Sequence, residues 1–232
     1  MKDLFGKALL DFQNGNYSED IMTSTNISDE DALPIPYLFR DYKDMPKLEQ
    51  KALKLSKGSI LDVGCGSGSH SLYLQKKGFK IKAIDISKGA IEVTKHRGVL
   101  QAAILNVLDE TETFDTILLL MNGTGIFQEL TQVSKYLSHL KSLLNPNGQI
   151  LIDSSDIKYM YEDEDGGYWM DMNSSYYGEL DYFLSYKGEK EAPMKWLYLD
   201  FETLKLACET VGLKCELVLE GAHFDYLAQL SL

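Results

Sequence analysis

Three glycines at alternate positions, with aspartates before and beyond them, are the residues of this sequence best suited to chemistry. Gly64, Gly66 and Gly68 follow an apolar run, and a helix is expected to begin directly after them. Glycine lets a backbone pass close beneath a ligand, and a helix start directs free N–H groups at it. Asp62 precedes the first glycine, and Asp85 lies about twenty residues beyond the turn, where a carboxylate can accept hydrogen bonds from two ribose hydroxyls. The spacing therefore predicts a pocket for an adenosine-type cofactor.

The position of the third glycine distinguishes between two kinds of cofactor. A dinucleotide-binding turn, G-x-G-x-x-G, needs glycine or alanine at its sixth position, which is Ser69 here. The third glycine falls one residue earlier, at Gly68, and Asp62 stands two residues before the first. This Asp-x-Gly-x-Gly-x-Gly arrangement resembles the first motif of the class I S-adenosylmethionine-dependent methyltransferases. The resemblance implies S-adenosylmethionine as cofactor and S-adenosylhomocysteine as product.

Strands and helices are expected to alternate after residue 57, which is typical of a parallel sheet covered by helices on both faces. The expected strands are 59–63, 80–85, 100–105, 116–121 and 149–153, with helices at 69–77, 87–95 and 128–144. After these, we expect a hairpin of strands 179–186 and 194–199 and a helix at 200–211. A terminal antiparallel pair of strands is expected at 213–220 and 224–230. A final helix and antiparallel pair resemble the end of the methyltransferase sheet. The expected fold is therefore α/β, a Rossmann-like seven-stranded mixed sheet with an antiparallel C-terminal strand and an added hairpin.

The chain is expected to divide into an N-terminal helical lid segment, 1–56, and a methyltransferase domain, 57–232, with an insertion at about 157–199. Within the first segment we expect a short helix, a mobile polar stretch over 18–31, and a break at the prolines before Tyr37. A second helix is expected after Asp44, whose side chain can cap it.

The resemblance also implies roles for individual residues around the cofactor. Asp62 would lie near its ammonium group, Asp85 on the ribose, and Arg40 on its carboxylate. The backbone cradle would come from Gly64, Cys65, Gly66 and Gly68. The adenine would be contacted by Ile86, Asn106 and Val107, and the methionine end by Met121 and Asn122. Several of these residues also have a purely structural alternative. Asp62 could cap the turn, and Asp85 could cap the helix near Ser87. Asp109 could contact the adenine in place of Asn106, or both could be turn residues, and Arg40 could pair with Asp41 or Asp44 on the surface.

Candidates for acceptor binding lie after the fifth strand and ahead of the core. Asp153 or Asp156 could act as a general base or orient an amine, although capping of the loop is the alternative. The segment 159–177 combines aromatic and acidic residues, which suits a cationic or amine-bearing substrate; a solvated acidic loop is the alternative. The residues expected to contact substrate are Tyr37, Tyr159, Trp169 and Tyr176.

The composition limits the kinds of molecule that this chain is expected to bind. A net charge of -12 disfavours a nucleic-acid groove, which needs clustered Lys and Arg, and favours a small-molecule substrate. The longest apolar run, 117–121, is too short to cross a bilayer, and the first residues do not form a secretory signal. Three cysteines and four histidines lack metal-ligand spacing, so we expect free thiols, no metal and a cytoplasmic location.

These observations favour an enzyme that transfers a methyl group in line to a small molecule without a metal. One alternative is a non-catalytic module that binds S-adenosylmethionine, because a fold does not settle function. Another is an NAD-dependent oxidoreductase, which Ser69 and the terminal hairpin disfavour. Aminopropyl transfer on the same scaffold would need the acidic residues of 159–177 to hold a polyamine.

Overall fold

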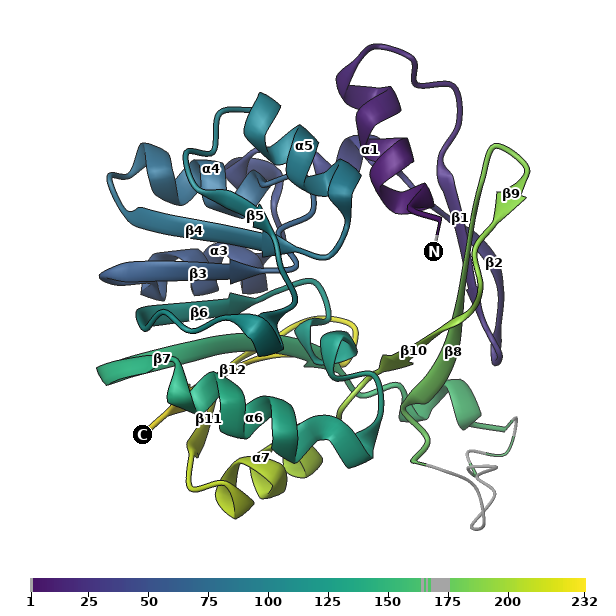
Figure 1. Cartoon of the computed structure of the whole chain (residues 1–232). Coiled ribbons are helices and arrows are strands. Elements are labelled where there is room, and N and C mark those ends of the chain that lie inside the picture. Colours follow the sequence, from purple (N-terminus) through teal and green to yellow (C-terminus); the bar gives the residue numbers. More distant parts are fainter. Residues whose placement is uncertain (1, 164, 166, 168–175) are drawn as a thin grey trace.

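A seven-stranded mixed sheet forms the centre of the computed structural model, which describes residues 2–163, 165, 167 and 176–232 (Figure 1). The strands lie in the order β11-β12-β7-β6-β3-β4-β5. Strands β3 to β7 pair in parallel, and β12 is antiparallel to both β7 and β11. Their bounds are β3 Ser59–Val63, β4 Lys80–Asp85, β5 Ala102–Ile104, β6 Phe114–Leu119, β7 Leu144–Ser155, β11 Lys214–Glu220 and β12 Asp225–Ser231. The predicted fold class is confirmed.

Helices pack on both faces of this sheet because neighbouring strand residues point to opposite sides. Leu61 and Ile150 face one cluster with the apolar sides of α6 (Val133–Ser142) and α7 (Phe201–Thr210). Ile60 and Leu151 face the other, with α3 (Lys47–Leu55) and Leu74 of α4 (Ser69–Lys76). The last core helix, α5 (Lys88–His96), packs with the end of β4.

The order of the sheet reverses between β3 and β6. From β3 the chain moves outward through β4 to β5, then returns to β6 and β7 on the other side of β3. Ligands of open α/β sheets bind outside the carboxyl ends of the strands at such a reversal. The glycine turn follows β3 and therefore lies at this point.

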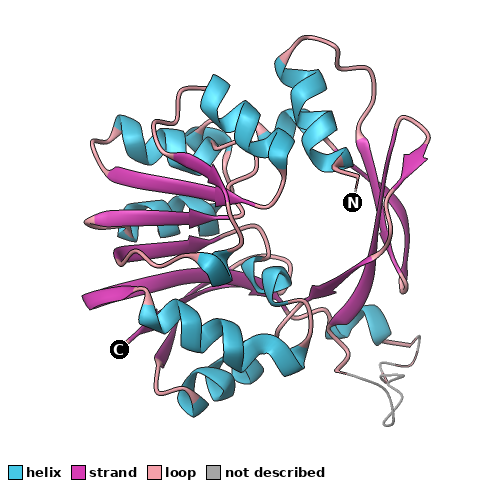
Figure 2. Cartoon of the chain, in the orientation of Figure 1, coloured by secondary structure: helices cyan, strands magenta, loops and turns pink. Residues whose placement is uncertain are grey.

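A second sheet, wholly antiparallel, stands opposite the carboxyl edge of the first (Figure 2). It contains β1 (Ile21–Thr25), β2 (Ser28–Leu33), β8 (Glu179–Tyr186), β9 (Glu189–Lys190) and β10 (Met194–Leu197). The predicted hairpin is present as β8 and β10. The expectation that 18–31 is mobile is wrong, because β1 pairs with β8, from Met22 with Ser185 to Thr25 with Tyr182. The backbone hydrogen bonds of β1 are made with a strand far away in the sequence, so the polar side chains of 18–31 did not indicate a strand.

Several predicted boundaries also differ from the structure. Helix α3 begins after Pro46 without a side-chain cap, so Asp44 does not cap it; Asp44 ends the short turn η1 (Tyr42–Asp44). Pro36 does not prevent helix formation, since it lies in the first turn of α2 (Ile35–Leu38), where proline is tolerated. The helix expected over 128–144 is shorter, because the turns η3 (Gly123–Phe127) and η4 (Leu130–Gln132) precede α6. The remaining short turns are η2 (Val107–Asp109) and η5 (Lys158–Tyr161).

Candidate active site

The glycine turn leaves β3 in a conformation that side chains disfavour. Gly64, Gly66 and Gly68 have φ angles of 70°, 53° and 80°, in the left-handed region. A Cβ on Gly68 would lie 2.9 Å from the Thr94 side chain, so this position also lacks room. The backbone N–H of Gly64 donates to the Ile84 carbonyl at 2.9 Å, which ties the turn to the end of β4. The structure therefore presents a backbone cradle at the reversal point.

Asp85 ends β4 directly beside this cradle. One carboxylate oxygen accepts from the Gly66 N–H at 3.0 Å and the other from the Ser87 N–H at 2.8 Å. Burial raises the pKa of Asp85, although these two bonds lower it. Ser87 caps α5, because its hydroxyl accepts from the Ala90 N–H at 3.0 Å. The helix cap that was the alternative for Asp85 is thus supplied by Ser87, and each Asp85 oxygen retains a lone pair for a further donor.

The N-terminal helix α1 (Leu4–Gln13) lies over this region. Asp3, which caps α1, accepts from the Ser87 hydroxyl at 2.8 Å and from the Gly89 N–H at 2.9 Å. A Cβ on Gly66 would be 3.8 Å from the Phe5 ring. Sequence reasoning missed both Asp3 and Phe5, because nothing near them in the chain indicates contact with residues more than sixty positions away.

Asp62 is buried below the turn, with 2% of its surface exposed. It accepts from the Ser71 hydroxyl at 2.6 Å, so its carboxylate holds the first turns of α4, as the capping alternative predicts. Burial raises the pKa of Asp62, while the charge of His70 and the bond from Ser71 lower it. Ile86, by contrast, is 73% exposed at the end of β4 and is free to lie against a ligand.

Arg40 belongs to a buried ion-pair group. Its guanidinium pairs with Glu49 of α3 and donates to the Tyr37 carbonyl at 2.6 Å, with its carbon 3.9 Å from the centre of the Tyr37 ring. The other Glu49 oxygen lies 2.7 Å from Nε2 of His70. The Nε of Arg40 is buried and has no hydrogen-bond partner. An unpaired buried N–H costs free energy, and a carboxylate from a ligand would satisfy it.

The electrostatics of this group favour its charged forms. Burial alone would raise the pKa of Glu49, but His70 and Arg40 together hold it below its usual value. Burial alone would lower the pKa of His70, but Glu49 and Asp62 raise it. The expected alternative of a surface pair between Arg40 and an acid of 41–44 is wrong, because the guanidinium is buried and turned toward Glu49. Glu49 was missed, although it lies one residue from Leu48 on the buried side of α3.

Asp153 holds the loop that leaves β6. Its two oxygens accept from the N–H groups of Met121 and Gly123, both at 2.9 Å, and the residue is 7% exposed. Burial raises the pKa of Asp153 to about 6, and the charge of Glu49 raises it further, against the lowering by the two bonds. Met121 and Asn122 have φ angles of 67° and 59°, so this carboxylate fixes a loop of unfavourable conformation. This geometry favours the capping role that was the alternative for Asp153.

The adenine candidates lie in η2, after β5. The side chain of Asn106 accepts from the Leu108 N–H at 2.9 Å and so caps this turn, whose Val107 is buried. Asp109 ends the same turn. Only the exposed face of Asn106 is therefore free for a ligand.

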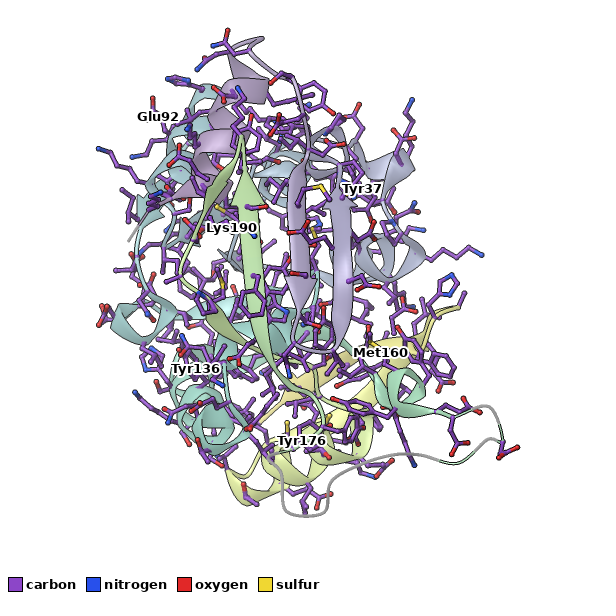
Figure 3. All side chains as sticks on the ribbon, turned by 90° about the vertical axis from the view of Figure 1, so that its right-hand side faces the viewer. Tyr37, Glu92, Tyr136, Met160, Tyr176 and Lys190 are labelled. Atoms are coloured by element: carbon purple, nitrogen blue, oxygen red, sulfur yellow. The ribbon has the colours of Figure 1, made fainter. Side chains whose placement is uncertain are left out.

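The other acceptor candidates divide into two groups. Tyr37 is 39% exposed and contacts Arg40. Asp156 and Tyr176 belong to a separate hydrogen-bonded group, in which Tyr177 bonds Asp156 at 2.8 Å and Tyr176 bonds Asp200 at 2.5 Å. Figure 3 shows Tyr37 toward one end of β2 and Met160 toward the other, with Tyr176 beyond it. Trp169 lies outside the described residues.

The second sheet is anchored to the exits of β6 and β7. The Thr124 hydroxyl lies 2.7 Å from that of Ser154 and donates to the Leu197 carbonyl at 3.0 Å. A Cβ on Gly125 would overlap the Trp196 ring at 2.2 Å, so the η3 backbone passes directly against β10. This anchoring fixes one wall of the space opposite the glycine turn, and sequence reasoning missed these residues.

Neither a metal-binding cluster nor a membrane-spanning helix is found in the part of the chain that the structure describes. Among residues 2–163, 165, 167 and 176–232, no three His, Cys, Asp or Glu side chains are grouped to hold a metal ion. In the same residues, no helix combines the length and apolarity needed to cross a membrane. Cys65, Cys208 and Cys215 are free thiols, as predicted.

The fold and the site together define an S-adenosylmethionine-dependent methyltransferase of class I. A model of the methyltransferase domain family matches residues 37–218. The chain belongs to this family, and the predicted resemblance is confirmed.

Individual relatives agree with this assignment. A methyltransferase from Bacteroides fragilis, crystallised with S-adenosylhomocysteine, is 45% identical with a TM-score of 0.93, covering 100% of this chain and 95% of that one. One from Clostridium acetobutylicum shares the fold at 16% identity, with a TM-score of 0.59 over 83% of this chain and 92% of its own. The ubiquinone biosynthesis O-methyltransferase of Rickettsia conorii is 30% identical over 47% of this chain. This chain spans only 38% of the length of that relative.

Proposed function

We propose that this chain transfers the methyl group of S-adenosylmethionine to a small-molecule acceptor. The observation that supports this most directly is the left-handed glycine cradle with the Asp85 carboxylate on its edge, at the reversal point of the sheet. Family membership and the relative crystallised with S-adenosylhomocysteine support the same cofactor. The net charge of -12 supports a small molecule rather than a nucleic acid, and the free thiols suit the cytoplasm.

In this proposal each end of the cofactor has its own partners. The backbone of 64–68 would hold its centre, Asp85 the ribose hydroxyls, and Ile86 with the 106–107 turn the adenine. Arg40 would bind the carboxylate through its free Nε, and Asp62, buried below the glycine turn, would interact with the ammonium end. Met121 and Asn122 would face the methyl group.

The bound cofactor supplies a sulfonium methyl group that a lone pair of the acceptor displaces, with the carbon–sulfur electrons returning to sulfur. The protein has to align the two molecules and exclude water, since the methyl group is already activated. The proton lost by the methyl acceptor passes to solvent or to a side-chain oxygen near the end of β7. Asp153 would position the β6 exit loop, since its two oxygens accept from the Met121 and Gly123 N–H groups of that loop.

Turnover with a panel of small amines and phenols tests the proposal. Mass spectrometry should detect S-adenosylhomocysteine and a product heavier by one methylene, and Asp85→Asn should weaken cofactor binding. Cofactor binding without transfer to any acceptor would favour the non-catalytic module. Failure to bind either adenosyl compound would overturn the proposal.

A further inference from the structure

A cavity of about 450 Å³ lies between the turn of the β1–β2 hairpin and the end of β7. We propose that this cavity binds the methyl acceptor, and that the acceptor is a ring-bearing molecule with a neutral or positive charge. The inference rests on the proposed function and goes beyond it by naming the acceptor class and its site. The residues that carry the argument are Thr25, Ser28, Ser155, Tyr159, Tyr198 and Asp225.

The cavity lies at the edge of the sheet where the glycine turn also lies. Ser155 is the last residue of β7, two positions beyond Asp153, and pairs with Asp225 of β12. Thr25 and Leu180 come from β1 and β8, so the second sheet forms the opposite wall. The cavity is therefore lined by residues of both sheets, beyond the carboxyl end of a parallel strand, where ligands of such sheets bind.

Two aromatic residues, Tyr159 and Tyr198, line the cavity. Tyr159 stacks on Phe224 with ring centres 4.9 Å apart and an angle of 17° between the planes. Both rings remain accessible, at 44% and 62% exposure. Phe224 itself does not line the cavity. The stacking on Phe224 supports the Tyr159 ring, which does line the cavity and offers aromatic surface to a ligand there.

The polar groups of the cavity favour a neutral or cationic ligand. Thr25, Ser28 and Ser155 contribute hydroxyl groups, and Asp225 contributes a carboxylate. Burial raises the pKa of Tyr198 to about 12, so its hydroxyl stays neutral. Among the described residues that line the cavity, none is lysine or arginine and the only basic side chain is His223, so a phosphate or carboxylate on the ligand would lack a lysine or arginine counter-charge.

The larger hollow, about 580 Å³, is a weaker candidate for the acceptor. It is lined by residues of β11, α3 and α7, including Lys51 and Lys205. None of its lining residues belongs to the carboxyl end of β3, β6 or β7. A ligand there would lie along the edge strand β11, away from the carboxyl ends of the parallel strands.

A titration followed by ligand-observed NMR, in the presence of S-adenosylhomocysteine, tests the proposal with tyramine as the probe. Tyr159→Ala should weaken tyramine binding about fivefold or more, since an aromatic ring that lines the cavity is lost. Tyr159→Phe should retain binding, because it keeps the ring.

Phe183→Ala is the matched control, because Phe183 is an aromatic residue, 40% exposed on β8, that does not line the cavity. It should leave tyramine binding unchanged, and 4-hydroxyphenylacetate and phenyl phosphate should bind at least about fivefold more weakly than tyramine. No tyramine binding, equal tyramine binding to Tyr159→Ala and wild type, or preference for phenyl phosphate would overturn the inference. Calorimetric titration with S-adenosylhomocysteine alone distinguishes failure of this inference from failure of the proposed function.

Discussion

At the scale of single residues, the site combines a half-buried acceptor carboxylate with a buried cation. Asp85 bonds only backbone N–H groups and retains lone pairs for a ligand, whereas Arg40 is engaged by Glu49 and keeps one unpaired N–H. These two side chains lie 45 positions apart in the chain. Together they would bind the ribose and carboxylate ends of one molecule.

Arg40→Lys should weaken S-adenosylhomocysteine binding about tenfold, because lysine keeps the charge but loses the planar fork and its Nε–H. Methylthioadenosine lacks the amino-acid end and should bind both proteins equally. Calorimetric titration of each ligand checks this. An equal loss for both ligands would show that Arg40 acts on the fold of the site and not on the carboxylate.

The Asp153 carboxyl should make the free energy of unfolding depend on pH. Its pKa is about 6 in the folded protein against 3.8 as the usual value, so the folded state binds more protons between these pH values. The contribution of this group to stability therefore falls as pH rises, and Asp153→Asn removes that dependence. From pH 5 to pH 7.5, wild type should lose about 1.5 kcal/mol relative to the variant in urea unfolding. A constant difference between the two would contradict the assigned pKa.

At the scale of elements, the turns and anchors determine where the two sheets meet. Asp153 fixes the exit of β6, and the Thr124–Ser154 pair joins that exit to β10. At the other end, Lys187 pairs with Asp11 of α1 at 2.8 Å. The second sheet is thus held at both ends against the carboxyl edge of the first.

Gly125→Ala should destabilise the protein by about 1–3 kcal/mol, because its Cβ would overlap Trp196. A Trp196→Leu variant should tolerate the alanine better, giving a favourable coupling in a double-mutant cycle measured by urea unfolding. Additive effects of the two substitutions would show that Gly125 is required for another reason. Gly188→Ala in the hairpin turn is a control, since its Cβ would meet no atom within 4 Å and only its φ of 73° opposes it.

The core elements could be predicted from the sequence because their signals are local. The run before Gly64 and the spacing to Asp85 indicated β3, the turn and β4, and Ser87 indicated the start of α5. The second sheet could not be fully predicted, because β1 is polar and its partner β8 lies about 160 residues away. The Arg40–Glu49–His70 group was missed for the same reason, since three elements bring it together.

At the scale of the whole molecule, the two sheets and α1 surround the end of the core where ligand binding is proposed (Figure 1). Asp3 and Phe5 from α1 contact the region of the glycine turn, and the β1–β2 turn reaches the cavity at the end of β7. Bound cofactor and acceptor would each contact the N-terminal segment as well as the core. Binding should therefore stabilise the assembly of all three parts.

Thermal unfolding should report this stabilisation. S-adenosylhomocysteine at a hundred times its Kd adds about 2.7 kcal/mol to the free energy of unfolding, which raises the Tm of a chain of this size by roughly 5–10 °C. NAD should give no rise. A rise with NAD alone would support the oxidoreductase alternative.

A crystal structure with bound S-adenosylhomocysteine tests the central claim most directly. We expect the ribose hydroxyls within hydrogen-bond distance of Asp85, the homocysteine chain over 64–68, and its carboxylate on Nε of Arg40. Adenosine bound away from Asp85, or a carboxylate facing solvent while Arg40 Nε stays unpaired, would contradict the site described above.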